Sequence, residues 1–160
     1  MAVDNRLLFL TVLAVSLGVV SCDSGGSPLS PISRSQLNAT GLGVTVATSG
    51  QGTGGLTFRI GIKNDGLREE TLHFSCSQMF DIEVTDGRRR LVWRWAYDKA
   101  FLQVLWQVEL SPGESYSQEA NWDLTGNDKK PLPPGSYRAR VYITNCPRDE
   151  GLGVEFTLII

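Results

Sequence analysis

Residues 90–95, with the sequence RLVWRW, decide how this chain folds. Side chains alternate between the two sides of a β-strand, so Leu91, Trp93 and Trp95 are expected to share one side. Two indoles on one face of a strand carry a large apolar area. That face therefore either anchors a hydrophobic core or builds an aromatic binding surface.

The rest of the chain after about residue 41 alternates apolar and polar residues in the same way. The dipeptide Asp86-Gly87 is a strong β-hairpin signal directly before RLVWRW. The pattern predicts about eight or nine short strands and no helical period longer than one or two turns. The expected strands lie near 56–62, 72–74, 80–84, 90–95, 104–110, 116–122, 137–143 and 154–160. We therefore predict an all-β fold, an antiparallel β-sandwich with one apolar face per strand.

This arrangement favours core packing for the tryptophans of RLVWRW. Every other expected strand offers a matching apolar face, so Trp93 and Trp95 are predicted to pack between two sheets. Arg94 has the opposite parity and is expected at the outer surface or its edge.

Residues 1–21 are predicted to be a signal peptide. Arg6 precedes an apolar run, Leu7–Val20, which is too short to span a bilayer and has the length of a signal-peptide core. The run ends in VVSC, residues 19–22, which resembles the lipobox of bacterial lipoproteins. This resemblance implies lipidation of Cys22. The alternative is an ordinary secretory signal with a chance cysteine.

A segment rich in Ser, Gly and Pro, residues 22–36, follows and is predicted to be a flexible tether. It leads to a single domain, residues 37–160. With a lipid as its membrane anchor, the protein is expected in the bacterial cell envelope, outside the cytoplasm. The formal net charge of −2 argues against nucleic acid as a partner.

Two further cysteines, Cys76 and Cys146, remain as a pair. Outside the cytoplasm such a pair is more often oxidised than free. A disulfide between them would close a loop of about 70 residues and add about 4 kcal/mol of stability. The alternative is two buried thiols.

No set of residues in the sequence predicts catalysis. The chain has one histidine, His73, and no Ser-His-Asp set or metal-ligand cluster can be assembled around it. Asp81, Glu83 and Asp86 are close in sequence, but Asp81 and Glu83 share the polar face of a strand. A solvated face is the favoured interpretation over a cation site. We expect no enzyme activity, no cofactor and no metal.

An ordered series of short motifs resembles the BsuPI domain family, named for an intracellular proteinase inhibitor. The series covers about residues 41–146. Its members are Asn64, Phe80-Asp81, Asp86-Gly87, VWRW at 92–95, Asp98, Phe101, LSPGE at 110–114, Trp122 and LPPGSY at 132–137. The resemblance implies an immunoglobulin-like β-sandwich that inhibits a serine proteinase of the subtilisin type, here tethered to a membrane. The alternative is a non-inhibitory binding or scaffold module of the cell envelope with a protein or glycan partner, which exposed aromatic residues would favour.

A substrate-like inhibitor presents a loop that is held at both ends, which lowers the entropic cost of binding. Two loops are candidates, Trp95–Leu105 and Leu124–Pro134. The first carries three side chains that could fill a large apolar S1 pocket: Tyr97, Phe101 and Leu102. The competing interpretation, which the sequence favours, is that these three cap the edge of the sandwich. The second loop is polar and rich in proline, as is typical of a plain connection.

Overall fold

A computed structural model of the chain describes residues 33–38, 41–50, 54–145 and 152–160. The regular elements in these ranges are ten β-strands. No helix within them has the length and apolar character needed to span a membrane. The strands are β1 (Ser33–Leu37), β2 (Leu42–Gly50), β3 (Leu56–Asn64), β4 (Glu70–Phe74), β5 (Phe80–Thr85), β6 (Leu91–Arg94), β7 (Trp106–Leu110), β8 (Ser115–Trp122), β9 (Ser136–Ile143) and β10 (Gly153–Ile159).

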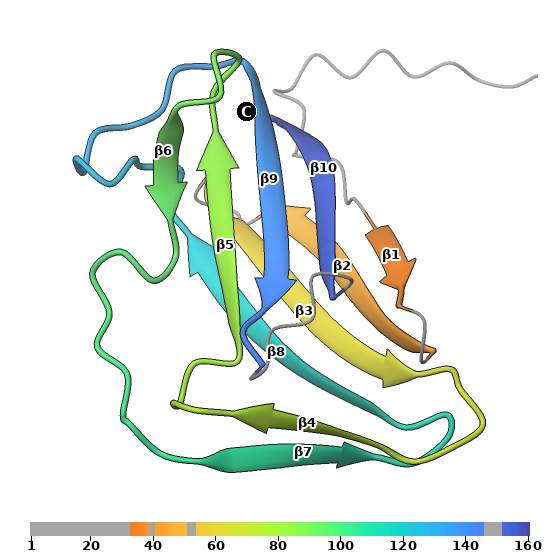
Figure 1. The fold of residues 1–160 in the computed structure, drawn as a ribbon. Coiled ribbons are helices and arrows are strands. Elements are labelled where there is room, and N and C mark those ends of the chain that lie inside the picture. Colours follow the sequence, from red (N-terminus) through yellow and green to blue (C-terminus); the bar gives the residue numbers. More distant parts are fainter. Residues whose placement is uncertain (1–32, 39–40, 51–53, 146–151) are drawn as a thin grey trace, which may run out of the picture.

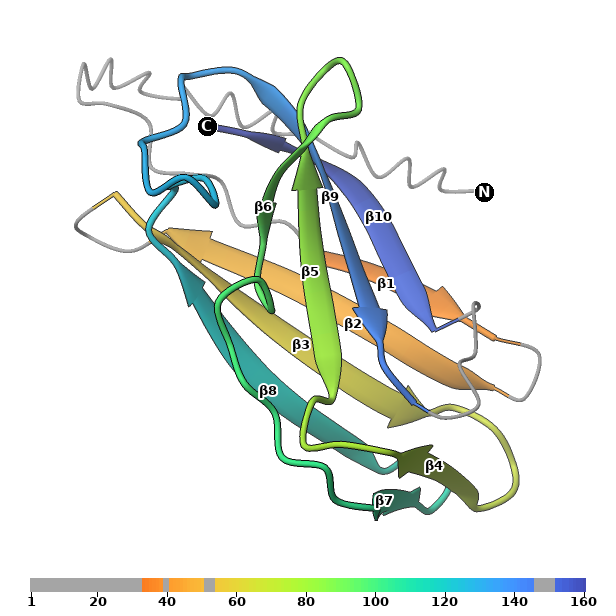
Figure 2. The ribbon, with the colours of Figure 1, turned by 60° about the vertical axis from the view of Figure 1, so that its left-hand side comes forward.

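The strands form two four-stranded sheets that face each other, and a small third sheet. One sheet has the order β1-β2-β3-β8 and the other β10-β9-β5-β6 (Figure 1). Strands β4 and β7 pair with each other at one end of the sandwich, as Figure 2 shows. All paired strands run antiparallel. The predicted all-β antiparallel sandwich is confirmed.

The core lies between the two large sheets. Alternate residues of each strand point inward, as the sequence pattern predicts, and those of β3 and β5 are almost completely inaccessible to solvent. The largest fully buried side chains include Phe58, Ile60, Ile62, Phe80, Ile82 and Met79.

Strand β1 begins inside the segment predicted to be a flexible tether, residues 22–36. Its five residues pair with β2, from Ser33↔Ala47 to Leu37↔Gly43. The tether prediction therefore needs correction for residues 33–36. An edge strand is held by main-chain hydrogen bonds, which need no apolar side chains, so its composition does not reveal it. The predicted signal peptide, residues 1–21, and Cys22 lie outside the described residues.

Strands β5 and β6 form the predicted hairpin, but its turn is longer than Asp86-Gly87. The residue with a left-handed backbone is Arg89, at φ 61°, and not Gly87. The Asp86 carboxylate accepts hydrogen bonds from the backbone N–H groups of Arg88 and Arg90, at 2.9 and 3.0 Å. Its hydrogen bonds with Arg90 lower the pKa of Asp86. These contacts close the turn that leads into RLVWRW.

Asn64 joins the small sheet to the sandwich. Its side chain is fully buried at the end of β3. The amide nitrogen donates to the carbonyl oxygens of Arg68 and Leu110, at 2.6 and 2.8 Å, and the amide oxygen accepts from the N–H of Gly66 at 2.9 Å. Leu110 is the last residue of β7. The hydrogen bond from Asn64 therefore fixes the end of β7 to the end of β3.

Candidate functional site

Trp93, in β6, packs between the two large sheets. Its ring stacks on Trp122 of β8, with centroids 4.6 Å apart, and lies 6.3 Å from the ring of Phe58 of β3. The indole therefore links one sheet to the other, and the prediction of core packing is confirmed for this residue. The prediction that Leu91 shares this face is wrong: a register shift at Val92 places Leu91 opposite Thr85, and its side chain is 49% exposed.

Trp95 lies just beyond β6 and begins the β6–β7 loop, residues 95–105. Its ring lies 4.5 Å from Phe80 and 5.8 Å from Phe101, measured between centroids. The ammonium group of Lys99 lies over the indole at 5.0 Å, a cation–π contact. Trp95 thus also packs against the core, and it organises the first half of the loop around itself.

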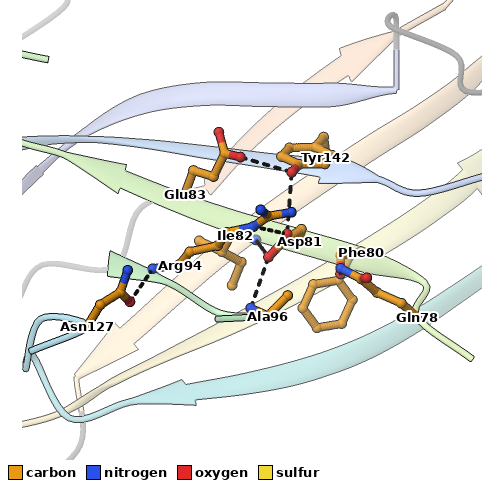
Figure 3. A network of polar contacts seen from close by, with 9 residues as sticks. All are labelled: Gln78, Phe80, Asp81, Ile82, Glu83, Arg94, Ala96, Asn127 and Tyr142. Carbon is orange, nitrogen blue, oxygen red and sulfur yellow. Dashed lines mark hydrogen bonds and ion pairs between the residues drawn. The ribbon is translucent and has the colours of Figure 1, made fainter. Parts of the chain in front are cut away.

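A buried carboxylate, Asp81, fixes the point where the loop leaves β6 (Figure 3). Its side chain has no solvent exposure. It accepts hydrogen bonds from the backbone N–H groups of Ile82 and Ala96, at 2.9 and 3.2 Å. Nε of Arg94 donates to it at 2.6 Å, and this bond raises the pKa of Arg94. The Tyr142 hydroxyl lies 3.4 Å from the carboxylate.

The prediction that Asp81 lies on a solvated face is wrong. The residue does point to the outer side of its sheet, but Arg94, Tyr142 and the turn at Ala96 cover it. A buried carboxylate is stable only when its oxygens are paired, and all of the contacts of Asp81 are with donors. The network therefore holds β5, β6, β9 and the start of the loop in one arrangement. Arg94 itself is 43% exposed, which agrees with its predicted place at the outer surface.

The raised pKa of Tyr142 predicts that the protein loses stability at alkaline pH. Burial, together with the charges of Asp81 and Glu83, raises the pKa of the Tyr142 phenol from 10.0 to about 12. The folded state holds the proton more tightly than the unfolded chain. The stabilisation is therefore complete below pH 10 and is lost as the pH rises towards 12. Urea unfolding of the wild type and Tyr142→Phe checks this.

At pH 8 the wild type should be more stable than Tyr142→Phe by about 1 kcal/mol, because the variant loses the hydroxyl's hydrogen bonds. This advantage should shrink above pH 10. Parallel stability curves for the two proteins up to pH 12 would contradict the assignment.

Two neighbouring residues, Cys76 and Ser77, hold the second half of the loop. The backbone N–H of Ser77 donates to the carbonyl of Leu102, and the Leu102 N–H donates to Oγ of Ser77, both at 2.9 Å. The indole N–H of Trp106 donates to the carbonyl of Cys76 at 2.6 Å, and its ring stacks on Phe74 at 4.3 Å. The loop is thus held at both ends and near its middle.

The three side chains predicted for a binding loop differ in their surroundings. Phe101 is partly buried against Trp95, whereas Tyr97 is 63% exposed and Leu102 is 75% exposed. Val104 and Leu105, which the predicted loop Trp95–Leu105 includes but the sequence does not single out, are 45% and 84% exposed. The alternation of Val104 with Trp106 predicts a strand that already includes Val104. Leu105 is apolar at a position where the alternation requires a polar residue. This departure is the sequence signal for an exposed apolar residue before β7.

The second candidate loop, Leu124–Pro134, lies beside the first. Lys129 forms an ion pair with Asp98, which lowers the pKa of Asp98, and Oδ1 of Asn127 accepts a hydrogen bond from the backbone of Arg94 at 3.0 Å. Between the two loops lies an open pocket of about 310 Å³. Its lining includes Trp93, Trp95, Trp122, Asp98, Asp123 and Lys129.

The predicted disulfide between Cys76 and Cys146 stays a prediction. Cys76 is partly buried and free of any disulfide within the described residues, and Cys146 lies outside them. Two residues before Cys146, Thr144 is held by two hydrogen bonds. Its backbone N–H donates to the carbonyl oxygen of Met79 at 2.9 Å, and its hydroxyl donates to the carbonyl oxygen of Gln78 at 2.7 Å.

The fold and the site define an all-β sandwich domain that presents one long loop between fixed anchors. The chain belongs to the BsuPI family, because the family model, described as an intracellular proteinase inhibitor, matches residues 42–147. The family is thus one of proteinase inhibitors, not of enzymes, and its partner class is proteinases. No curated protein matches the chain.

Solved structures with a similar segment include three β-glucosidases. One is from Erythrobacter marinus (18% identity over 66% of this chain, TM-score 0.35), and another is β-glucosidase 3B from Thermotoga neapolitana (18% over 71%, TM-score 0.38). The third, from intestinal bacteria, is involved in saponin metabolism (16% over 82%, TM-score 0.33). The matched part covers 13%, 15% and 16% of those chains, respectively.

The predicted location in the cell envelope is contradicted by the family, which is described as intracellular. That prediction rested on an apolar run and the short motif VVSC, residues 19–22. The family match begins at residue 42, so the predicted signal peptide and the lipidation of Cys22 stay predictions.

Proposed function

We propose that this chain inhibits a serine proteinase of the subtilisin type by placing the β6–β7 loop in the proteinase's substrate cleft. The observation that carries the proposal is the combination of strong exposure and firm anchoring in this loop. Leu102 and Leu105 are 75% and 84% exposed, although the residues around them are held by Ser77, Cys76 and Phe74.

Leu102, Val104 and Leu105 are exposed apolar side chains within four consecutive residues, and an exposed apolar patch is a sign of an interaction site. A substrate cleft binds a segment of chain with an apolar side chain in the S1 pocket. A loop that is already ordered loses little conformational entropy on binding, so more of the contact energy appears as affinity. The anchors at Trp95 and Trp106 supply this order.

A binding module for a protein or a glycan is the second candidate function. The pocket between the two loops favours it, because Trp93, Trp95 and Trp122 contribute aromatic surface there and Asp98, Asp123 and Lys129 contribute polar groups. Tryptophan side chains are enriched at binding surfaces. The pocket is lined by the first half of the β6–β7 loop, whereas the inhibitory proposal uses Leu102 and Leu105 in its second half.

Titration of the full-length protein against subtilisin separates the two functions. We expect hydrolysis of a chromogenic peptide to fall to zero near one equivalent of inhibitor, at micromolar concentration or lower, since proteinase–inhibitor complexes are among the tightest known. The chain should stay intact on a gel during the assay. Undiminished hydrolysis at micromolar excess would exclude inhibition of this enzyme class and leave the binding module.

A further inference from the structure

Three consecutive residues of the β6–β7 loop, Gln103, Val104 and Leu105, are exposed between two anchors. Leu102 is held by Ser77 on one side, and Trp106 is held by Cys76 and Phe74 on the other. Within the described part of the chain, no backbone hydrogen bond joins these three residues to another segment. Their N–H and carbonyl groups are therefore available to a partner.

This availability distinguishes Leu105 from the other exposed side chains of the loop. The residue whose side chain enters S1 must also offer its N–H to the proteinase's main chain and its carbonyl to the oxyanion hole. Leu102 has both groups paired with Ser77. Tyr97 lies in a tight turn, where its N–H donates to the carbonyl oxygen of Arg94 at 3.1 Å. Neither can meet the requirement without losing an anchor.

We infer that Leu105 is the residue that enters the S1 pocket of the target proteinase, while Gln103 and Val104 pair with its main chain. This inference rests on the proposed function and adds the contact residues and the specificity determinant. A leucine side chain suits a large apolar pocket. The anchors on either side keep the segment from collapsing onto the sandwich, which explains how a leucine remains 84% exposed.

Leu105→Ala tests the inference, with Leu67→Ala as the matched control. Leu67 is 96% exposed and lies in the connection between β3 and β4, so both variants remove the same surface side chain. We expect Leu105→Ala to raise the inhibition constant against subtilisin at least about 30-fold, as for a central contact residue. Leu67→Ala should change it by less than about threefold, and both should keep the wild-type circular dichroism spectrum.

Leu105→Lys adds a gain of function that a merely structural role would not produce. Trypsin carries an aspartate in its S1 pocket, so this variant should inhibit trypsin at least about tenfold better than the wild type does and subtilisin less well. Equal inhibition constants for Leu105→Ala and Leu67→Ala would overturn the assignment of Leu105 while leaving inhibition intact. A wild type that does not inhibit subtilisin would overturn the proposed function itself.

Discussion

Replacing Asp81 by alanine is expected to lower the free energy of unfolding by about 3 kcal/mol, because two backbone N–H groups lose their acceptor at about 1–3 kcal/mol each. The substitution leaves the backbone N–H groups of Ile82 and Ala96 without their acceptor and Arg94 without its partner. Urea unfolding should show a lower midpoint with an unchanged slope. Because Ala96 is the second residue of the β6–β7 loop, the same variant should also inhibit subtilisin less well.

Glu83→Ala is the control for Asp81. Glu83 lies on the same face of β5, two residues away, and its carboxylate accepts a hydrogen bond from the Tyr142 hydroxyl at 3.0 Å. It is partly exposed, so its removal should cost no more than about 1 kcal/mol. Equal losses for the two variants would show that the buried network does not hold this region together.

The sequence predicted the two-sheet architecture because nearly all of it follows from local alternation. Phe58, Ile60 and Ile62 repeat every second residue, and so do Phe80, Ile82 and Val84. Strand β1 could not be predicted from alternation, because it is held at the sheet edge by backbone pairing with β2. The turn at Arg89 also escaped prediction, since a left-handed arginine gives no compositional signal.

The site was less predictable, because it depends on which segments meet. Asp81 has the parity of an outward-facing residue, and only the fold brings Arg94 and Ala96 over it. Val104 continues the alternation of β7, yet the pairing of β7 ends at Phe74↔Trp106. With no partner strand beyond this pair, the chain from Gln103 to Leu105 leaves the sheet and becomes exposed.

Replacing Trp93 by alanine is expected to cost about 3 kcal/mol, near the lower end for a large aromatic side chain because Trp93 is partly exposed. The loss arises at the junction of the two sheets, where the indole stacks on Trp122 and contacts Phe58. Trp93→Phe should recover more than half of it, because a smaller ring still fills part of the space. Urea unfolding followed by circular dichroism measures both losses.

Leu91→Ala is the control, since Leu91 lies in the same strand but on the other face of the sheet: a register shift at Val92 places Leu91 opposite Thr85, whereas Trp93 lies opposite the buried Val84. The Leu91 side chain is 49% exposed, and the truncation should cost less than about 1 kcal/mol. The contrast compares the two faces of β6, the inner one at Trp93 and the outer one at Leu91. If Trp93→Ala were as mild as Leu91→Ala, Trp93 would belong to a binding surface, and the pocket beside it would become the stronger candidate for function.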